Sequence, residues 1–339
     1  MLNDCYYFGN YTPNGWASII KKNCFSDYKK ISICGYPNCV KQQIFKRIKL
    51  NFLRRNIGYT DLTTENGSMG VLCEQLKIIV VDGEFAEFDD SEKINIYDYV
   101  CEDFLKENNE KIKRFDTNRK RLEMRCERFL SACKSINDDM RRIDSINIDF
   151  YKLNRYSSRL WKKYGSKPTG KIGIQEKRFV TCVSQDGVEL NTGAFDRLCK
   201  KSAVIYDKTG ACSAPVIDKI KNYALSSGYN TISCICPVNL EIEHLIIPEL
   251  KFGLFSSRYY HRAELNNCEK IYSSKFHTFN SPSTVQRLDF SAKAYKSLMN
   301  EVFNCIAGIN EIDKNLNLLL NKNTDTVRIY NQIVNRIFP

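Results

Sequence analysis

Two octets, about half a chain apart, contain the residues whose types and spacing could bind phosphate. The first reads GYPNCVKQ from Gly35 to Gln42, and the second reads DKTGACSA from Asp207 to Ala214. Each follows a short apolar run and precedes a helical pattern, which is the layout of the phosphate-binding loop G-x-x-x-x-G-K-[ST]. In such a loop backbone N–H groups surround the phosphates, the lysine reaches the β- and γ-phosphates, and the hydroxyl holds Mg²⁺.

The first octet keeps part of this chemistry. Gly35 and Lys41 match the pattern, whereas Val40 stands at the second glycine and Gln42 at the hydroxyl position. A valine disfavours the left-handed backbone that a glycine adopts there. We therefore expect weak nucleotide binding or none, with ATP or GTP and Mg²⁺ as the cofactors. The candidate nucleotide-binding residues are Gly35, Tyr36, Pro37, Asn38, Lys41, Gln42 and Asp82.

Asp82 is a candidate because it ends the apolar run Ile-Ile-Val-Val, where an acidic residue would hold Mg²⁺. It is also the one candidate metal ligand. The alternative hypothesis is structural: residues 35–38 form an ordinary turn between a strand and a helix, and Lys41 is a solvated lysine of the first helical turn.

The second octet has lost more of the pattern. Cys212 replaces the second glycine, Ser213 replaces the lysine, and Ala214 replaces the hydroxyl. Asp207 adds a negative charge beside the path that a phosphate would take. We therefore expect no triphosphate binding at this octet, although Pro215 suits the first turn of a helix.

The octets belong to a longer repeat. Each is preceded by an apolar segment that turns at a glycine, and each helical pattern ends in a Gly-Tyr pair before a new strand. Later in each copy comes a continuous apolar run, as in strands buried on both faces of a parallel sheet. These features predict a tandem α/β protein. The matching segments are Tyr6–Ile20 with Arg178–Thr192, Gly58-Tyr59 with Gly228-Tyr229, and Leu76–Asp82 with Leu250–Ser256.

On these residues the chain resembles the bacterial tandem P-loop ATPase-like proteins of Firmicutes, a largely uncharacterised family. The likeness covers nearly the whole chain. It includes the lead-in Tyr7–Gly15, the loop Gly35-Tyr36-Pro37, the strand ending in Asp82-Gly83, and the stretch CPVNLEIEHLIIPELKFGLFSS from Cys236 to Ser257. The resemblance implies P-loop NTPase-like three-layer domains with parallel sheets in both halves, each with a helical appendage. Of the family's site residues, only Gly35, Lys41 and Asp82 can be carried over.

Helical patterns separate and follow the two copies. We expect a first core over residues 1–100, a basic helical insertion and linker over 101–170, a second core over 171–285, and C-terminal helices over 286–339. Apolar stripes on these helices are typical of packing seams and could also contact a protein partner. The stripes are Leu122, Cys126, Phe129, Cys133, Ile136, Met140, Ile143, Phe150 and Leu153; Leu298, Val302, Ile306, Ile309, Leu316 and Leu319; and Val327, Tyr330, Val334 and Ile337.

The net charge of the chain is +12, and much of the excess lies in one segment. Residues 110–165 carry 16 Lys and Arg against 8 Asp and Glu, a net charge of +8. Such a segment could bind nucleic acid, with Arg119, Lys120, Arg121, Arg125 and Arg128 in one stretch. A solvated helix face explains the same charge, and we favour that interpretation.

The fifteen cysteines are scattered through apolar stretches, and no basic and apolar leader opens the chain. The sequence therefore predicts reduced, buried thiols and a cytoplasmic protein without a membrane span. The close pairs Cys34/Cys39 and Cys234/Cys236 lack a second pair at zinc-finger spacing, so we expect no structural metal.

These observations favour a degenerate tandem P-loop NTPase-like protein that serves as a binding or regulatory scaffold and is not an efficient enzyme. The first alternative is an ATPase or nucleotide kinase-like phosphotransferase that uses Lys41 and Asp82. It would need a non-standard loop, and losing the preorganised phosphate cradle removes most of this catalysis. The second alternative is nucleic-acid binding through the basic helical segment.

Overall fold

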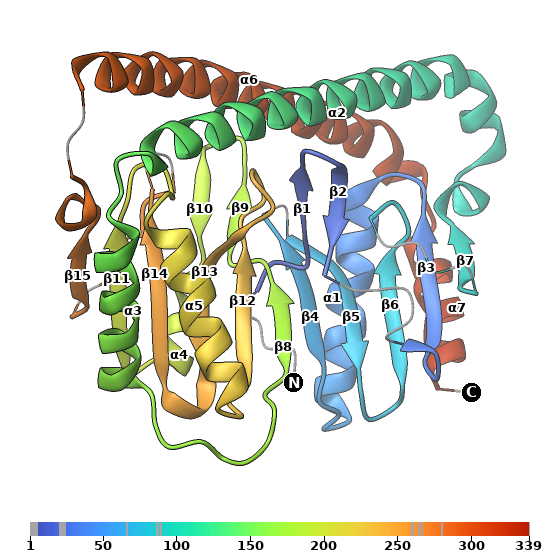
Figure 1. The fold of residues 1–339 in the computed structure, drawn as a ribbon. Coiled ribbons are helices and arrows are strands. Elements are labelled where there is room, and N and C mark those ends of the chain that lie inside the picture. The colour runs from blue at the N-terminus through green and yellow to red at the C-terminus, as the bar shows by residue number, and fades with distance from the viewer. Residues whose placement is uncertain are drawn as a thin grey trace. The chain divides into compact units, whose positions relative to one another are not determined.

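The computed structural model describes residues 6–19, 25–65, 67–85, 88, 90–258, 261–263, 265, 267–278 and 281–338. Residues 1–5, on which the prediction of no leader depends, lie outside this set. The chain forms two compact units (Figure 1). The first comprises Met1–Asn10, Gly15–Cys126 and Asn304–Pro339, and the second comprises Tyr11–Asn14 and Glu127–Phe303.

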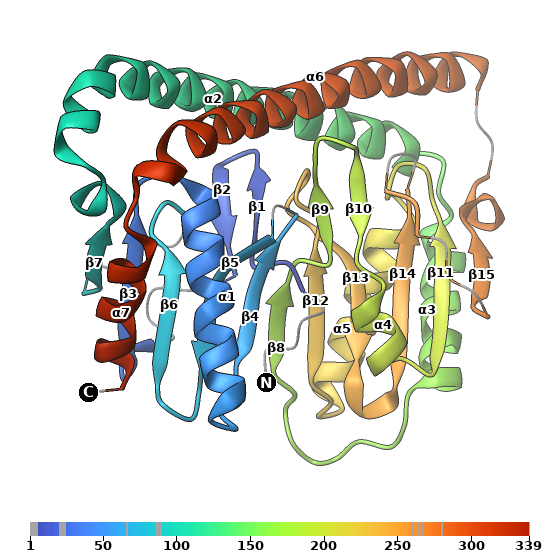
Figure 2. The same ribbon diagram turned by 180° about the vertical axis from the view of Figure 1, so that it is seen from behind.

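The first unit is built on a five-stranded sheet in the order β4-β5-β6-β3-β7. The strands β6, β3 and β7 run parallel, whereas β4, β5 and β6 pair antiparallel. Helix α1 and the C-terminal helix α7 lie side by side on one face of this sheet (Figure 2). The bounds are β3 Lys29–Cys34, α1 Asn38–Arg54, β4 Thr60–Thr64, β5 Gly67–Cys73, β6 Ile78–Asp82, β7 Glu92–Asn95 and α7 Thr326–Ile337.

The second unit is built on a six-stranded sheet in the order β15-β11-β14-β13-β12-β8. The strands β15, β11 and β14 run parallel, as do β12 and β8, whereas β12, β13 and β14 pair antiparallel. Helices α3 and α5 pack on each other and share one apolar core with the sheet. The bounds are α3 Phe150–Tyr164, β8 Gln175–Arg178, β11 Lys201–Tyr206, α5 Ser213–Ser226, β12 Thr231–Ile235, β13 Ile242–Ile247, β14 Phe252–Ser257 and β15 Glu269–Tyr272.

The two sheets repeat one strand order, because β3 and β11 hold the same place between two parallel neighbours. One of these neighbours is β6 in the first copy and β14 in the second, and these two strands contain the apolar runs that match in the sequence. The expectation of an α/β protein with long helices is therefore confirmed. The prediction of parallel sheets is wrong, because both sheets are mixed.

The physical reason is the length of the connections. Only residues 65–66 join β4 to β5, and only 74–77 join β5 to β6. A connection this short can make a hairpin, whereas parallel neighbours need a crossover of a dozen or more residues. A buried apolar run does not reveal the direction of its neighbours, since a strand covered on both faces looks alike in either sheet.

The remaining elements flank the sheets. The pairs β1-β2 and β9-β10 form two small two-stranded sheets at corresponding places in the two copies. Short 3-10 turns follow β7 and β15 in the same way. The bounds are β1 Gly9–Thr12, β2 Gly15–Ser18, β9 Thr181–Val183, β10 Val188–Leu190, α4 Gly193–Leu198, η2 Ile96–Tyr99, η3 Pro248–Leu250, η4 Ser273–Phe276 and η5 Asn321–Asn323.

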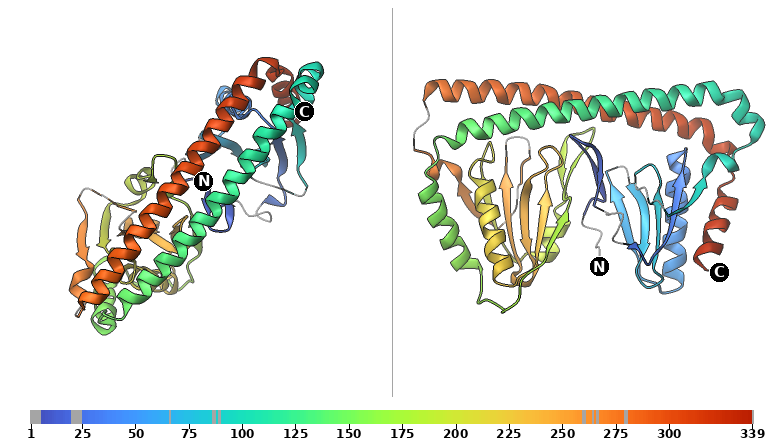
Figure 3. Two further views of the ribbon diagram at one scale, coloured as in Figure 1. Left: turned by 90° about the horizontal axis from the view of Figure 1, so that it is seen from above. Right: turned by 45° about the vertical axis from the view of Figure 1, so that its right-hand side comes forward.

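Two long helices, α2 (Glu102–Ser145) and α6 (Pro282–Leu320), each begin in one unit and end in the other (Figure 3). Most of their predicted stripes are buried, so these side chains are packing residues. Phe150 is 45% exposed and Val327 is 54% exposed, and of the stripe predicted on α7 only Ile337 is buried. On α7 the buried positions are Ile329, Ile333 and Ile337, which repeat every four residues and so share one helix face.

The core of the first unit joins both ends of the chain. Side chains of α1 and β3 form one apolar cluster with Leu316 and Leu320 of α6 and with the buried isoleucines of α7. Residues 304–339, the end of the segment expected as separate C-terminal helices, are thus part of the first unit, whereas α6 begins in the second. None of the described helices is both long and apolar enough to cross a membrane.

Candidate functional site

The first octet begins directly after β3 and covers a three-residue loop and the first turn of α1, as the sequence predicted. Gly35 has a φ of +86°, in the left-handed region that favours glycine. A Cβ at this position would lie 3.0 Å from Oδ1 of Asn95. Glycine is therefore favoured at position 35 for two reasons: the positive φ of the turn, and the close approach of Asn95 at the start of η2.

The structure brings Lys41 and Asp82 together as a buried ion pair. Nζ of Lys41 donates to Oδ1 of Asp82 at 2.7 Å, and each residue is 1% exposed. The parallel register of β3 and β6 places Asp82 opposite Ile33, at the strand end that leads into the loop. Burial raises the pKa of the Asp82 carboxyl, although the Lys41 ammonium opposes this shift. The two charged groups that could serve a nucleotide and Mg²⁺ thus satisfy each other.

Side chains of the protein itself accept hydrogen bonds from the backbone N–H groups of the loop. The Gly35 N–H donates to Oε1 of Glu84 at 3.2 Å, and the Cys39 N–H donates to Oδ1 of Asn317 at 3.1 Å. In a phosphate-binding loop these groups point at the anion. Here a carboxylate and an amide oxygen take that place.

The other predicted residues make internal contacts. Nδ2 of Asn38 donates to Oδ2 of Asp313 on α6 at 2.9 Å. Gln42 lies against the start of β5, where a Cβ on Gly67 would come within 2.7 Å of the Gln42 Oε1. Tyr36 is buried, with its ring centroid 5.6 Å from Nζ of Lys41, and burial raises the pKa of its hydroxyl.

The sequence analysis did not identify Arg119 as a residue that packs against the first loop. It was interpreted as one of several cations on a solvated or nucleic-acid-binding helix, but it is 5% exposed. Its Nε donates to Oδ1 of Asp313 at 3.0 Å, and its guanidinium also pairs with Glu123. The guanidinium carbon lies 5.5 Å from the Tyr36 ring centroid. No sequence signal separates Arg119 from the cations around it, because its burial depends on α6.

We call Lys41, Asp82, Glu84, Arg119, Glu123 and Asp313 the first polar cluster. It contains four carboxylates and two cations. Burial raises the pKa values of Glu123 and Asp313, as it does for Asp82. Four carboxylates accompany only two cations, so the cluster has no excess of positive formal charge to attract a polyphosphate.

The second octet is closed by its own carboxylate. Oδ2 of Asp207 accepts from the N–H of Cys212 at 2.8 Å and from the N–H of Ser213 at 2.6 Å. Asp207 is 1% exposed and lies between the end of β11 and the start of α5. Its carboxylate thus occupies the place where a phosphate would accept these two N–H groups.

An ion pair between His277 and Asp144 lies next to this second loop and is hydrogen-bonded to it. Nε2 of His277 lies 3.0 Å from Oδ1 of Asp144, and Nδ1 lies 3.0 Å from the Ser273 carbonyl oxygen. Both oxygens only accept, so both imidazole nitrogens carry protons. The hydrogen bond to Asp144 accordingly raises the pKa of His277. The other Asp144 oxygen accepts from Oγ1 of Thr209, within the loop, at 2.6 Å.

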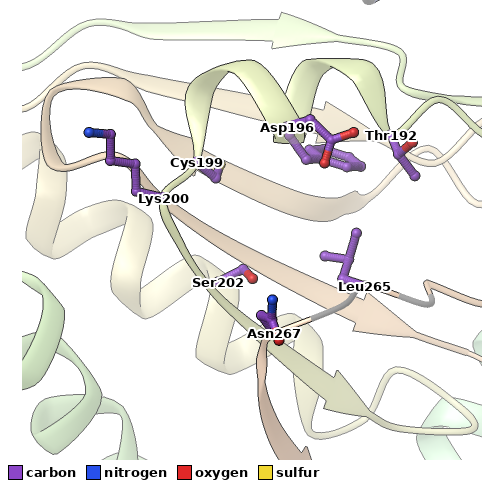
Figure 4. A pocket seen from close by; sticks show the side chains of 8 residues that line it. Thr192, Asp196, Cys199, Lys200, Ser202, Leu265 and Asn267 are labelled. Atoms are coloured by element: carbon purple, nitrogen blue, oxygen red, sulfur yellow. The ribbon is translucent and has the colours of Figure 1, made fainter.

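A cavity of about 260 Å³ lies elsewhere in the second unit (Figure 4). Asp196 and Asn267 contribute to its lining, together with Cys199 and Ser202. Burial raises the pKa of the Cys199 thiol to about 12, so this sulfur is protonated at neutral pH and is a poor nucleophile. Neither octet contributes to the lining of this cavity.

The described cysteines are free, and most of them are buried. The predicted burial of the thiols is thus confirmed for most of the described cysteines. Comparison with protein-family models, curated proteins and solved structures found no match to this chain.

Proposed function

We propose that this protein is a degenerate tandem P-loop NTPase-like scaffold, with a binding or regulatory role and with weak or no nucleotide binding in its first half. The carrying observation is the buried Lys41–Asp82 pair, which commits the one remaining loop lysine and its acidic partner to each other. A nucleotide with Mg²⁺ would have to separate this buried pair and supply a new partner to each of its two charges.

The loop contacts support the same proposal. A phosphate entering the first loop would also have to displace Glu84 from the Gly35 N–H and Asn317 from the Cys39 N–H. In the second loop it would have to displace Asp207 from two N–H groups at once. Each displaced oxygen acceptor lies on the chain itself and so is present at high effective concentration.

Titration calorimetry with ATP and GTP in the presence of Mg²⁺ tests the proposal. We expect little or no heat of binding and no Mg²⁺-dependent hydrolysis by the wild-type chain. Lys41→Ala is the test variant, and Lys46→Ala is the matched control because Lys46 is an exposed lysine of the same helix. Nucleotide turnover that Lys41→Ala abolishes and Lys46→Ala preserves would establish the enzyme and overturn the scaffold.

One observation favours nucleic acid as a second candidate partner. Helix α3 carries exposed cations to which the described residues offer no carboxylate within ion-pair distance, and Tyr151 beside them is 73% exposed. Exposed cations interleaved with an aromatic ring suit a phosphate backbone with stackable bases. The cations are Lys152, Arg155, Arg159 and Lys162.

Fluorescence anisotropy with labelled single-stranded RNA and double-stranded DNA tests this candidate. Binding through α3 should weaken steeply with salt and should fall in the triple variant Arg155→Gln/Arg159→Gln/Lys162→Gln. The matched control is Lys106→Gln/Lys120→Gln, which removes exposed cations that already pair with carboxylates on α2. Absence of binding at low salt removes the candidate.

A further inference from the structure

Three side chains with metal-ligating atoms converge in the interior of the second unit. Cys236 directly follows β12, Glu243 lies in β13, and His261 lies in the turn after β14. Their ligand atoms all lie within 4.8 Å of one another. We call these residues the buried triad.

Backbone contacts explain why separate segments meet here. Strands β12 and β13 pair antiparallel, and the Cys236 N–H donates to the Glu241 carbonyl at 2.8 Å. The Arg258 N–H donates to the His261 carbonyl at 2.9 Å, which turns His261 back toward the end of β14. The triad is therefore held by strand pairing and by a closed turn.

The interatomic distances are close to those of a coordinated ion. Nδ1 of His261 lies 2.8 Å from Oε1 of Glu243 and 3.4 Å from Sγ of Cys236. In a tetrahedral zinc site, bonds of about 2.0–2.1 Å to N and O and about 2.3 Å to S separate these atoms by about 3.3 and 3.5 Å. To reach these zinc distances, Nδ1 of His261 would have to move about half an ångström from the Glu243 oxygen and hardly at all from the Cys236 sulfur.

The protein alone leaves polar groups at this place without partners. All three guanidinium nitrogens of Arg258, which is 6% exposed, are buried and have no hydrogen-bond partner in the part of the chain that the structure describes. Buried donors are nearly always satisfied, so Arg258 needs an oxygen acceptor that the described residues do not supply.

We propose that Cys236, Glu243 and His261 bind a divalent zinc-class ion, and that Arg258 donates to an oxygen ligand, such as water, at its fourth position. One thiolate, one imidazole and one carboxylate form a donor set suited to Zn²⁺ and unsuited to Mg²⁺ or Ca²⁺. The thiolate and the carboxylate together balance the charge of the ion.

Outer contacts would orient the carboxylate. Oγ1 of Thr181 donates to Oε2 of Glu243 at 3.2 Å, on the oxygen that does not face His261. Nε2 of His244 lies 3.8 Å from the same oxygen. Such contacts commonly fix the ligands of metal sites.

Metal analysis of the full-length chain tests the proposal. We would strip the protein with a chelator, reload it with Zn²⁺, remove the excess and measure the zinc by mass spectrometry. We expect one zinc per chain in the wild type and a loss of at least tenfold in Zn²⁺ affinity for Cys236→Ser and His261→Gln. Cys234→Ser is the matched control, since Cys234 is buried two residues away and is not a member of the triad.

Cobalt substitution keeps the test decisive if the variants fail to fold. The wild-type chain loaded with Co²⁺ should show a thiolate-to-cobalt charge-transfer band and tetrahedral ligand-field bands. Failure of the wild type to retain zinc overturns the proposal. An unchanged Zn²⁺ affinity of Cys236→Ser also overturns it, as does Co²⁺ binding by the wild type without a charge-transfer band. Nucleotide titrations do not enter these outcomes, so the metal site and the scaffold stand or fall separately.

Discussion

Replacing Lys41 by methionine tests whether the buried ion pair exists in solution. The substitution keeps most of the side-chain volume, so the main change is the loss of the ammonium that contacts Asp82 at 2.7 Å. Asp82 would remain buried, with the Glu84 N–H as a hydrogen-bond donor at 3.0 Å. Breaking a buried pair by removing one partner costs about 3–5 kcal/mol, so we expect Lys41→Met to lower the free energy of unfolding by about that amount.

A second substitution should restore most of the loss. In Lys41→Met/Asp82→Asn no charge is left unpaired, and the amide oxygen can still accept from the Glu84 N–H. We expect the double variant to be within about 1–2 kcal/mol of the wild type, which gives a large coupling energy in a double-mutant cycle. The matched control Lys120→Met breaks an exposed pair with Asp116 and should cost less than about 1 kcal/mol.

The deficit of Lys41→Met should depend on pH. Burial raises the pKa of Asp82 in the folded protein, and removing the Lys41 ammonium takes away the charge that opposes this shift. The folded state then binds a proton that the unfolded state has released, so stability falls as pH rises above the unfolded pKa. We therefore expect a larger deficit at pH 8 than at pH 5.

Urea unfolding followed by tryptophan fluorescence measures these changes. The chain has two tryptophans, and Trp16 and Trp161 lie in different units. A Trp161→Phe background therefore reports the unfolding of the first unit alone. If Lys41→Met lowers the free energy of unfolding of the Trp161→Phe background by less than about 1 kcal/mol at pH 8, the Lys41 ammonium does not pair with Asp82 in solution. That result would refute a closed first loop.

Three further predictions concern the loops. Gly35→Ala should destabilise the first unit by about 1–2 kcal/mol because of its positive φ, whereas Gly58→Ala, with open space around its Cβ, should be near neutral in the same urea assay. Asp207→Asn should destabilise the second unit by about 1–2 kcal/mol, read on its tryptophan, because an amide cannot replace the charge-assisted bonds to two N–H groups; an unchanged midpoint would contradict the cap. The raised pKa of His277 means that its pair with Asp144 stabilises the fold fully below the unfolded histidine pKa and loses this effect as pH rises through the folded value. His277→Gln should therefore lower the urea midpoint most near pH 5–6 and least near pH 9, and a pH-independent difference would argue against the ion pair.

Part of the first candidate site could be predicted from sequence spacing. The octet predicted a strand, a loop and a helix, and the run before Asp82 predicted a neighbouring strand, so Lys41 and Asp82 were expected at one place. Their direct pairing was not predicted, because a motif gives positions along the chain and not the distance between two side-chain ends. Arg119 and Asn317 were missed, since they reach the loop only from α2 and α6.

The buried triad shows the same limit. Its members are separated by 6 and 17 residues, which matches no recognised metal motif, and the search for paired cysteines pointed to Cys234 and Cys236 together. The antiparallel pairing of β12 and β13 and the turn after β14 bring Cys236, Glu243 and His261 together. No periodicity in the sequence carries that information.

The sequence by itself determined the elements and their repetition. Apolar runs, glycine turns and helical periodicity depend on neighbours along the chain, so they predict two α/β copies and long amphipathic helices without tertiary information. Tertiary structure decided the direction of the strands, the closing of both loops and the pairing of the buried ion pairs. These depend on contacts between segments far apart in the sequence, such as Asp313 with Arg119 and Asp144 with His277. Burial makes those contacts strong enough to decide whether a loop lysine such as Lys41 contacts a ligand or a carboxylate of its own chain.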